Sequence, residues 1–141
     1  MARHRPLLTG VLGLALIVEV TCSPPSQRAP SQTGWYIPLT ASADGKASGD
    51  VLIHENGAGH WMVMITLQGL EPNSRYAARI RDGACAGAVL HPLERMVVDA
   101  NGTGHSDTDL AVTPDASWWI EVAGPESLPE PSIACGQVLP N

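Results

Sequence analysis

The chain has 141 residues, enough for one domain with its own hydrophobic core and too few for two. Its 14 glycines, 12 prolines and 4% aromatic residues, with no Phe, are typical of short strands joined by frequent turns rather than of long helices. The formal net charge of −6 repels phosphate backbones, so we expect no nucleic-acid partner.

The first 21 residues predict an export signal. Arg3 and Arg5 precede an apolar stretch, Leu7–Val18, that is shorter than the roughly 20 residues of a membrane span. Cys22 follows at once, and a segment rich in Pro, Ser and Gln comes after it. This arrangement resembles a bacterial lipoprotein signal, which implies that residues 1–21 are removed and that a lipid on Cys22 tethers the exported protein to the membrane of the cell envelope.

The lipoprotein motif is incomplete. Such signals prefer Leu three residues before the cysteine and a small residue directly before it, and this chain has Glu19 and Thr21. An uncleaved N-terminal anchor and ordinary secretion are the alternatives. In each case we expect a flexible polar linker at residues 22–34 and one domain at residues 35–141.

Two further cysteines, Cys85 and Cys135, remain once Cys22 carries a lipid. An oxidising compartment favours a disulfide between them, and such a bridge would close a long loop. A pair of free buried thiols is the alternative.

Short alternating runs separated by turn residues predict an all-β domain of about eight strands, a β-sandwich or flattened barrel. Asn-Gly pairs within two of the connections indicate hairpins. The expected strands are Trp35–Ala43, Ala47–Glu55, His60–Leu70, Arg75–Arg81, Arg95–Ala100, Gly104–Val112, Ser117–Ala123 and Ser132–Val138. The segment around Cys85 is predicted to be a loop.

Alternation also predicts which side chains face the core, because successive residues of a strand point to opposite faces. The expected inward set is Val51, Ile53, Trp61, Val63, Ile65, Leu67, Trp118, Ile120 and Val122. The expected outward set is Asp50, His54, His60, Met62, Met64, Thr66, Trp119, Glu121 and Ala123.

Several segments resemble Cu,Zn superoxide dismutase and its small secreted relatives. They are Gly49–Gly57, Gly69-Leu70, Tyr76–Cys85 and Ile133–Val138, with the Cys85 loop and the Ala134-Cys135-Gly136 ending as the most specific parts. The resemblance covers residues 35–138. It implies a Greek-key, immunoglobulin-like β-sandwich and a bridge from the loop cysteine to the C-terminal cysteine.

The metal site that the resemblance implies is not present in this sequence. Arg79, Arg81 and Ala123 stand where the family has copper-binding histidines, and a guanidinium has no lone pair for a metal. The part of the chain that aligns with the zinc loop supplies only His91 and Glu94. We therefore expect no catalytic residues, no cofactor and no enzymatic activity.

Two groups of residues are candidate binding sites. Arg79, Arg81, Trp119 and Glu121 should share an outward face that could bind an unknown protein or an anionic or carbohydrate ligand. The alternative is an ion-pair cluster without a ligand.

The second candidate is a soft ligand set for copper, formed by His54, His60, Met62 and Met64 on one face of the first hairpin. That hairpin could close with His54 opposite His60 or, with a bulge, opposite Ala58. The alternative to a copper site is an edge of mixed polarity whose methionines pack against a loop.

The sequence as a whole predicts a non-catalytic, envelope-tethered lipoprotein whose domain is a binding or structural module. A divergent dismutase with a new metal site and a copper-handling protein that uses the Met/His face are the alternatives.

Overall fold

The computed structural model of the chain describes residues 34–42, 45–125 and 131–138. The chain divides into two units, Met1–Pro30 and Ser31–Asn141, and all the described residues lie in the second. The predictions for residues 1–21, for Cys22 and for most of the linker fall outside the described residues. In the part that is described, no helix is long and apolar enough to span a membrane.

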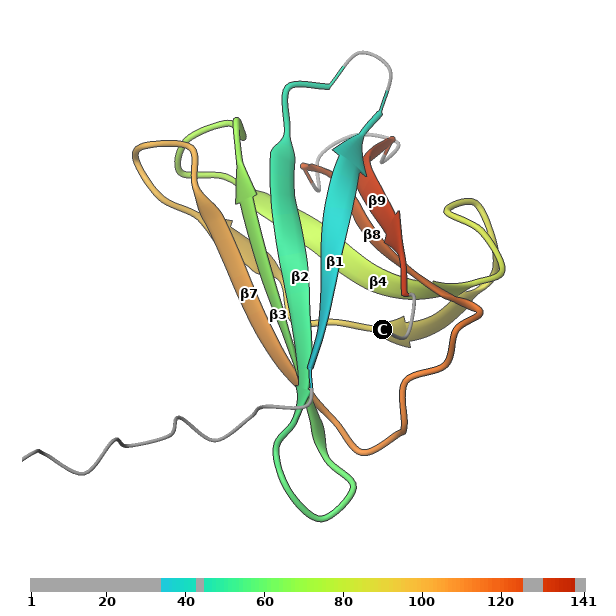
Figure 1. Ribbon diagram of the computed structural model, residues 1–141. Helices are drawn as coiled ribbons and strands as arrows, with labels where there is room; N and C mark the ends of the chain where they lie inside the picture. The colour runs from blue at the N-terminus through green and yellow to red at the C-terminus, as the bar shows by residue number, and fades with distance from the viewer. Residues whose placement is uncertain (1–33, 43–44, 126–130, 139–141) are drawn as a thin grey trace, which may run out of the picture. The chain divides into compact units, whose positions relative to one another are not determined.

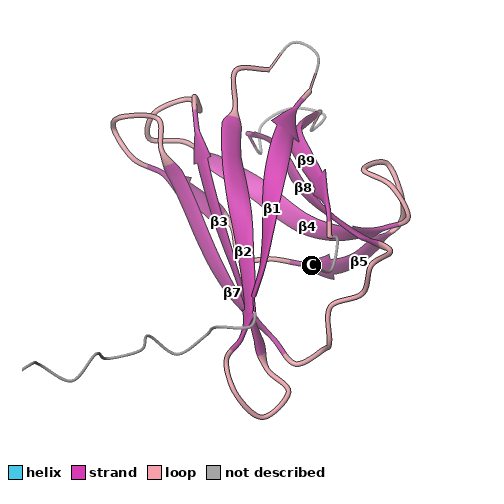
Figure 2. Cartoon of the chain, viewed as in Figure 1, coloured by secondary structure: helices cyan, strands magenta, loops and turns pink. Residues whose placement is uncertain are grey.

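Nine strands joined by loops make up the described part of the chain, which contains no helix (Figure 2). The strands are β1 (Gly34–Ala41), β2 (Ser48–Glu55), β3 (Trp61–Gln68), β4 (Arg75–Asp82), β5 (Val89–Pro92), β6 (Met96–Val98), β7 (Gly104–Leu110), β8 (Trp118–Pro125) and β9 (Ser132–Gln137). The predicted all-β class is confirmed.

The strands close into an antiparallel barrel because β4 pairs with β8 as well as with β6. The order around the barrel is β4-β6-β7-β3-β2-β1-β9-β8, and β5 is an additional strand on the C-terminal half of β4. The connections β3–β4 and β7–β8 join strands that are not neighbours, which gives Greek-key connectivity. Figure 1 shows β1, β2, β3 and β7 as one layer, with β4, β8 and β9 crossing behind them.

All eight expected strands are present, with ends that differ by a few residues from the prediction. Cys85 lies in a loop, as predicted, but the predicted loop continued to Arg95 and missed the short strand β5 at Val89–Pro92. These four residues are too few and too irregular in polarity to show alternation, and β5 gains its hydrogen bonds only from its tertiary partner β4.

Both expected closures of the first hairpin are wrong. His54 lies opposite Met62, and the three loop residues Gly57, Ala58 and Gly59 all have positive φ, with values of 89°, 51° and 82°. The backbone N–H of Asn56 donates to the carbonyl oxygen of His60 at 2.8 Å and begins the ladder there. The even-numbered residues still share one face, as expected.

The barrel interior contains the predicted inward side chains. Val51, Ile53, Val63, Leu67, Ile120 and Val122 are all fully buried, and Trp118 is buried as well. Trp61 is only partly buried, and it stacks on Trp35 with ring centroids 5.6 Å apart. This stacked pair packs against the edge of the core.

The second predicted hairpin, β6–β7, is held by the carboxylate of Asp99. Its Oδ1 accepts hydrogen bonds from the backbone N–H of Thr103 at 2.9 Å and of Asn101 at 2.8 Å. These bonds hold the pKa of Asp99 below its usual value of 3.8, with the bond from Thr103 as the largest cause. Gly102 has a φ of 79°, which suits glycine at this turn.

Asp99 should make the domain less stable in acid. Its folded-state pKa is depressed, so its contribution to stability is present above its unfolded pKa of 3.8 and is lost as the pH falls below that value. In Asp99→Asn the loss of thermal stability between pH 5 and pH 3 should be smaller than in the wild type. Melting curves across this range test the effect, with exposed Asp107→Asn as the control. Equal pH dependence in the wild type and Asp99→Asn would contradict it.

Candidate functional site

The predicted ligand face lies on the outer surface of β4 and β8. Arg79 is directly opposite Glu121, and Arg81 is opposite Trp119. The register therefore brings all four predicted residues together, on the face that alternation predicts. Ala123 follows on the same face of β8 and is fully buried.

The three charged side chains of this face form one ion-pair cluster, here called the Arg–Glu cluster (Arg79, Arg81 and Glu121). Arg81 Nε donates a hydrogen bond to Glu121 Oε2, and Arg79 Nη1 lies 3.8 Å from the same oxygen. Glu121 is only 4% exposed, although we expected an outward and accessible side chain. The two guanidiniums compensate this carboxylate for its lost hydration.

The loop between β4 and β5 lies beside the Arg–Glu cluster and is fixed by the Cys85–Cys135 disulfide, with 6.1 Å between the two Cα atoms. This confirms the predicted bridge. Cys135 is opposite Glu121 in the β8–β9 ladder, so the bridge holds the loop next to the buried carboxylate. Arg81 Nη1 adds a second tie by donating to the carbonyl oxygen of Gly87 at 2.8 Å.

Gly87 is required by this loop because a Cβ at this position would collide with the carbonyl oxygen of Asp82. Its own N–H donates to the carbonyl oxygen of Ala84 at 2.9 Å, which closes a tight turn. The turn presents the carbonyl of Gly87 to Arg81. The glycines around Cys85 were therefore a sequence signal for a tightly folded loop.

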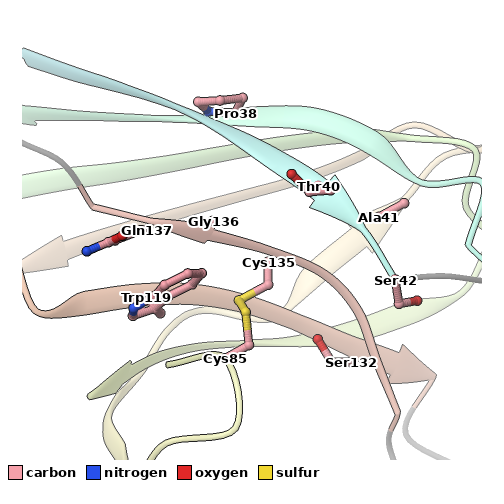
Figure 3. Close-up of a pocket in the computed structure, with 10 residues that line it drawn as sticks. All are labelled: Pro38, Thr40, Ala41, Ser42, Cys85, Trp119, Ser132, Cys135, Gly136 and Gln137. Atoms are coloured by element: carbon pink, nitrogen blue, oxygen red, sulfur yellow. A yellow bond between two sulfur atoms is a disulfide. The ribbon is translucent and has the colours of Figure 1, made fainter. Parts of the chain in front are cut away.

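A groove of about 550 Å³ lies beside the disulfide, on the outer face of β1, β9 and β8 (Figure 3). Its lining residues are Pro38, Thr40, Ala41, Ser42, Cys85, Trp119, Ser132, Cys135, Gly136 and Gln137. This volume falls within the usual range for small-molecule sites, roughly 300–1,000 Å³.

The groove follows a short seam of the barrel. β1 pairs with β9 through two residue pairs only, Thr40 with Cys135 and Ala41 with Ala134. Pro38 lies two residues before Thr40 on β1, and it has no N–H with which to extend the ladder. The two strands therefore leave a hollow beside Pro38.

The side chains that line the groove carry no charge. Trp119 and the disulfide form apolar parts of it, and hydroxyl or amide groups come from Thr40, Ser42, Ser132 and Gln137. Gln137 Nε2 donates to the carbonyl oxygen of Ala116 at 3.3 Å, which orients the amide. None of the lining residues named above has an ionisable side chain apart from the bridged cysteines. The groove can therefore supply hydrogen bonds and apolar contacts, but no acid, base or counter-ion.

The predicted ligand face is thus divided in two. Trp119 lines the groove, whereas Arg79, Arg81 and Glu121 do not. The polar lining residues were missed by the sequence analysis. Pro38 within an otherwise regular strand was the one signal that could have pointed to this seam.

The second candidate, the face that carries His54, His60, Met62 and Met64, lies on the outer side of β2 and β3. His54 is opposite Met62, and Met62 is in turn opposite Asp109 of β7. Met64 follows on β3 and is 38% exposed.

His60 is tied to the neighbouring strand by a short contact. Its Nδ1 lies 2.6 Å from Asp109 Oδ1, and Asn56 Nδ2 donates to the other oxygen of the same carboxylate at 3.3 Å. The bond from His60 is the largest cause that holds the pKa of Asp109 below its usual value. Asp109 therefore joins the tip of the first hairpin to β7.

Comparison with known protein families finds no family model that matches this chain, and comparison with curated proteins finds no match. Within residues 34–42, 45–125 and 131–138, no three His, Cys, Asp or Glu side chains form a group that could hold a metal ion.

The disulfide should contribute strongly to stability because it closes a loop with a sequence separation of 50 residues. Cys135→Ser should lower the free energy of unfolding by about 2–5 kcal/mol. Denaturant titration measures the change, and Ser132→Ala, in the same groove, is the control. Alkylation of Cys85 in the non-reduced wild-type protein would contradict the bridge.

Proposed function

We propose that this chain is a non-catalytic, envelope-tethered lipoprotein whose domain binds a neutral carbohydrate in the groove beside the disulfide. The observation that carries the proposal is the groove itself: it has the size of a ligand site, and it combines Trp119 with hydroxyl and amide groups. A domain with a purely structural role does not require such a site.

The absence of charge from the groove lining favours a neutral ligand. An anionic ligand would be repelled by the net charge of −6, and the two predicted arginines lie outside the lining and contact Glu121. A cationic ligand would find no carboxylate among the lining residues. A sugar ring can place its apolar face on an indole while its hydroxyls bond to Thr40, Ser42, Ser132 and Gln137.

Several lining residues of the groove are held in fixed positions by their neighbours, as a specific binding site requires. Cys135 is fixed on both sides, by its ladder partner Thr40 and by the bridge to Cys85. Gln137 lies opposite Trp119 and is held by Ala116. A lining that is ordered before the ligand arrives loses less entropy on binding.

The non-catalytic part of the proposal rests on the residues at the expected copper positions. Arg79 and Arg81 cannot donate a lone pair to a metal, and both contact Glu121. Ala123 has no donor atom in its side chain. These substitutions favour a binding module over the alternative of a divergent dismutase.

The tether rests on the apolar N-terminal segment and on Cys22. Lipidation leaves the domain on a polar linker outside the cytoplasmic membrane. The intact mass of the mature protein tests this part, because a lipid-modified Cys22 must be the first residue. An N-terminus well downstream of Cys22 would contradict the tether.

Neutral oligosaccharides should bind at the groove. In an NMR titration with cellotriose, chitotriose and maltotriose, we expect at least one sugar to shift the Trp119 indole and the amides of Thr40 and Gln137. Trp119→Ala should weaken that binding roughly 5- to 13-fold, because the loss of one stacked ring corresponds to roughly 1–1.5 kcal/mol.

The control for this experiment is Tyr36→Ala, which removes an aromatic side chain that is 63% exposed and does not line the groove. It should leave sugar binding unchanged. The absence of binding by all three sugars, or binding that survives Trp119→Ala, would contradict the carbohydrate proposal. Selective binding of charged sugars that is lost in Arg79→Ala would assign the ligand to the Arg–Glu cluster instead.

The domain should not dismutate superoxide above the rate in buffer when copper and zinc are supplied, because Arg79, Arg81 and Ala123 stand in place of imidazoles. A stopped-flow assay of superoxide decay measures this, with metal-free protein as the control. Activity that disappears in His54→Ala or His91→Ala would show that a metal centre exists elsewhere and would favour the enzyme.

A further inference from the structure

His54 has a buried ring nitrogen without a partner. Its Nδ1 has no hydrogen-bond partner among the described residues, although the atom is shielded from solvent. Buried polar atoms in proteins are nearly always paired, so each exception needs a physical reason, and the binding of an ion is one such reason. Because His54 lies on the outer face of β2, a metal ion bound to its Nδ1 would account for the missing hydrogen-bond partner.

A soft donor lies directly across the ladder from this imidazole. Met62 is the cross-strand partner of His54, and neighbouring strands are about 4.8 Å apart. Both side chains point to the outer face, because they are even-numbered residues in strands whose odd-numbered residues fill the core. A thioether and an imidazole are therefore neighbours on one surface.

A second imidazole is fixed on the other side of Met62. Asp109 is the partner of Met62 on β7, and its carboxylate lies 2.6 Å from His60 Nδ1. An ionised carboxylate can only accept a hydrogen bond, so Nδ1 of His60 must carry the proton. This leaves the lone pair of the neutral ring on Nε2, and a carboxylate that orients a histidine in this way is usual behind metal-ligating histidines.

The surface around these donors is acidic. Asp109 and Asp107 lie opposite Met62 and Met64 on β7, and Asp50 is on the same face of β2. Such a patch raises the local concentration of cations. The donors themselves are nitrogen and sulfur atoms, which select soft ions such as Cu(I) over Ca²⁺ or Mg²⁺.

We propose that His54 Nδ1, Met62 Sδ and His60 Nε2 form a Cu(I)-binding site on the outer face of the β2–β3 hairpin, with Met64 beside it as a further thioether. The site shares no residue with the groove lining, and the inference goes beyond the proposed carbohydrate binding. Asp109 is a positioning residue for His60 and does not itself bind the metal.

The test is a Cu(I) titration of the metal-free mature domain under anaerobic, reducing conditions, with bicinchoninic acid as the competing chelator. We expect one Cu(I) per chain. Met62→Leu and His54→Gln should each lower the affinity at least tenfold, and Asp109→Asn should lower it about 10–100-fold through His60. His105→Gln, an outward histidine on β7 outside this row, is the matched control and should have no effect.

A second readout identifies the ligand atoms directly. Addition of Ag(I), a soft ion without redox chemistry, should shift the ε-methyl NMR signal of Met62 and leave that of buried Met96 unchanged. Binding that survives both Met62→Leu and His54→Gln in folded variants would overturn the proposal. So would the absence of one-to-one binding, or an equal shift of the two methyl signals. None of these results affects the sugar titration, because the groove lining contains none of the proposed copper ligands.

Discussion

The pairing of β4 with β8 is the contact on which the rest of the structure depends, because it closes the barrel. The ladder runs from Tyr76 opposite Pro125 to Asp82 opposite Trp118. Its register sends Ile80 and Ile120 into the core and, on the other face, sets Arg79 against Glu121. A slip of one residue would turn the charged side chains inward and the apolar ones outward, so the Arg–Glu cluster and the core specify the same register.

The ladder between β1 and β9 is much shorter than the ladder between β4 and β8, and the groove lies along this short ladder. β1 makes six residue pairs with β2 but two with β9. The Cys85–Cys135 bridge lies at this short seam, since Cys135 is the partner of Thr40. The bridge ties β9 to the loop between β4 and β5, so β9 is held in place although Pro38 shortens its ladder with β1. The gap between β1 and β9 can therefore hold a ligand while β9 stays fixed in position.

Much of the fold followed from local patterns, and much of the site did not. Alternation identified eight strands and put Arg79 and Arg81 on one face, because strand geometry is local. It missed β5, which has only four residues and depends on β4 for its hydrogen bonds. The burial of Glu121 and the seam at Pro38 depend on which strands become neighbours. That depends on the Greek-key connections, which have no local signal.

The register of the first hairpin shows the same limit at a finer scale. Asn56-Gly57 correctly indicated a turn, but it left open where the ladder begins. The positive φ values of Gly57, Ala58 and Gly59 give a three-residue loop, and this loop sets His54 against Met62 rather than His60. A register shift of two residues therefore decides which side chains are neighbours on the proposed copper-binding surface.

Charge separates the two surfaces of the barrel and makes their proposed roles compatible. Around Glu121 one carboxylate faces two guanidiniums, which gives the Arg–Glu cluster a local positive charge within a chain of net charge −6. A cation is repelled there, in the region where the dismutase resemblance would place copper. The outer face of β2, β3 and β7 carries acidic side chains instead, next to imidazole and thioether donors. The two proposals therefore do not compete: the charge distribution would favour a cation on the outer face of β2, β3 and β7, and the uncharged groove would favour a neutral ligand.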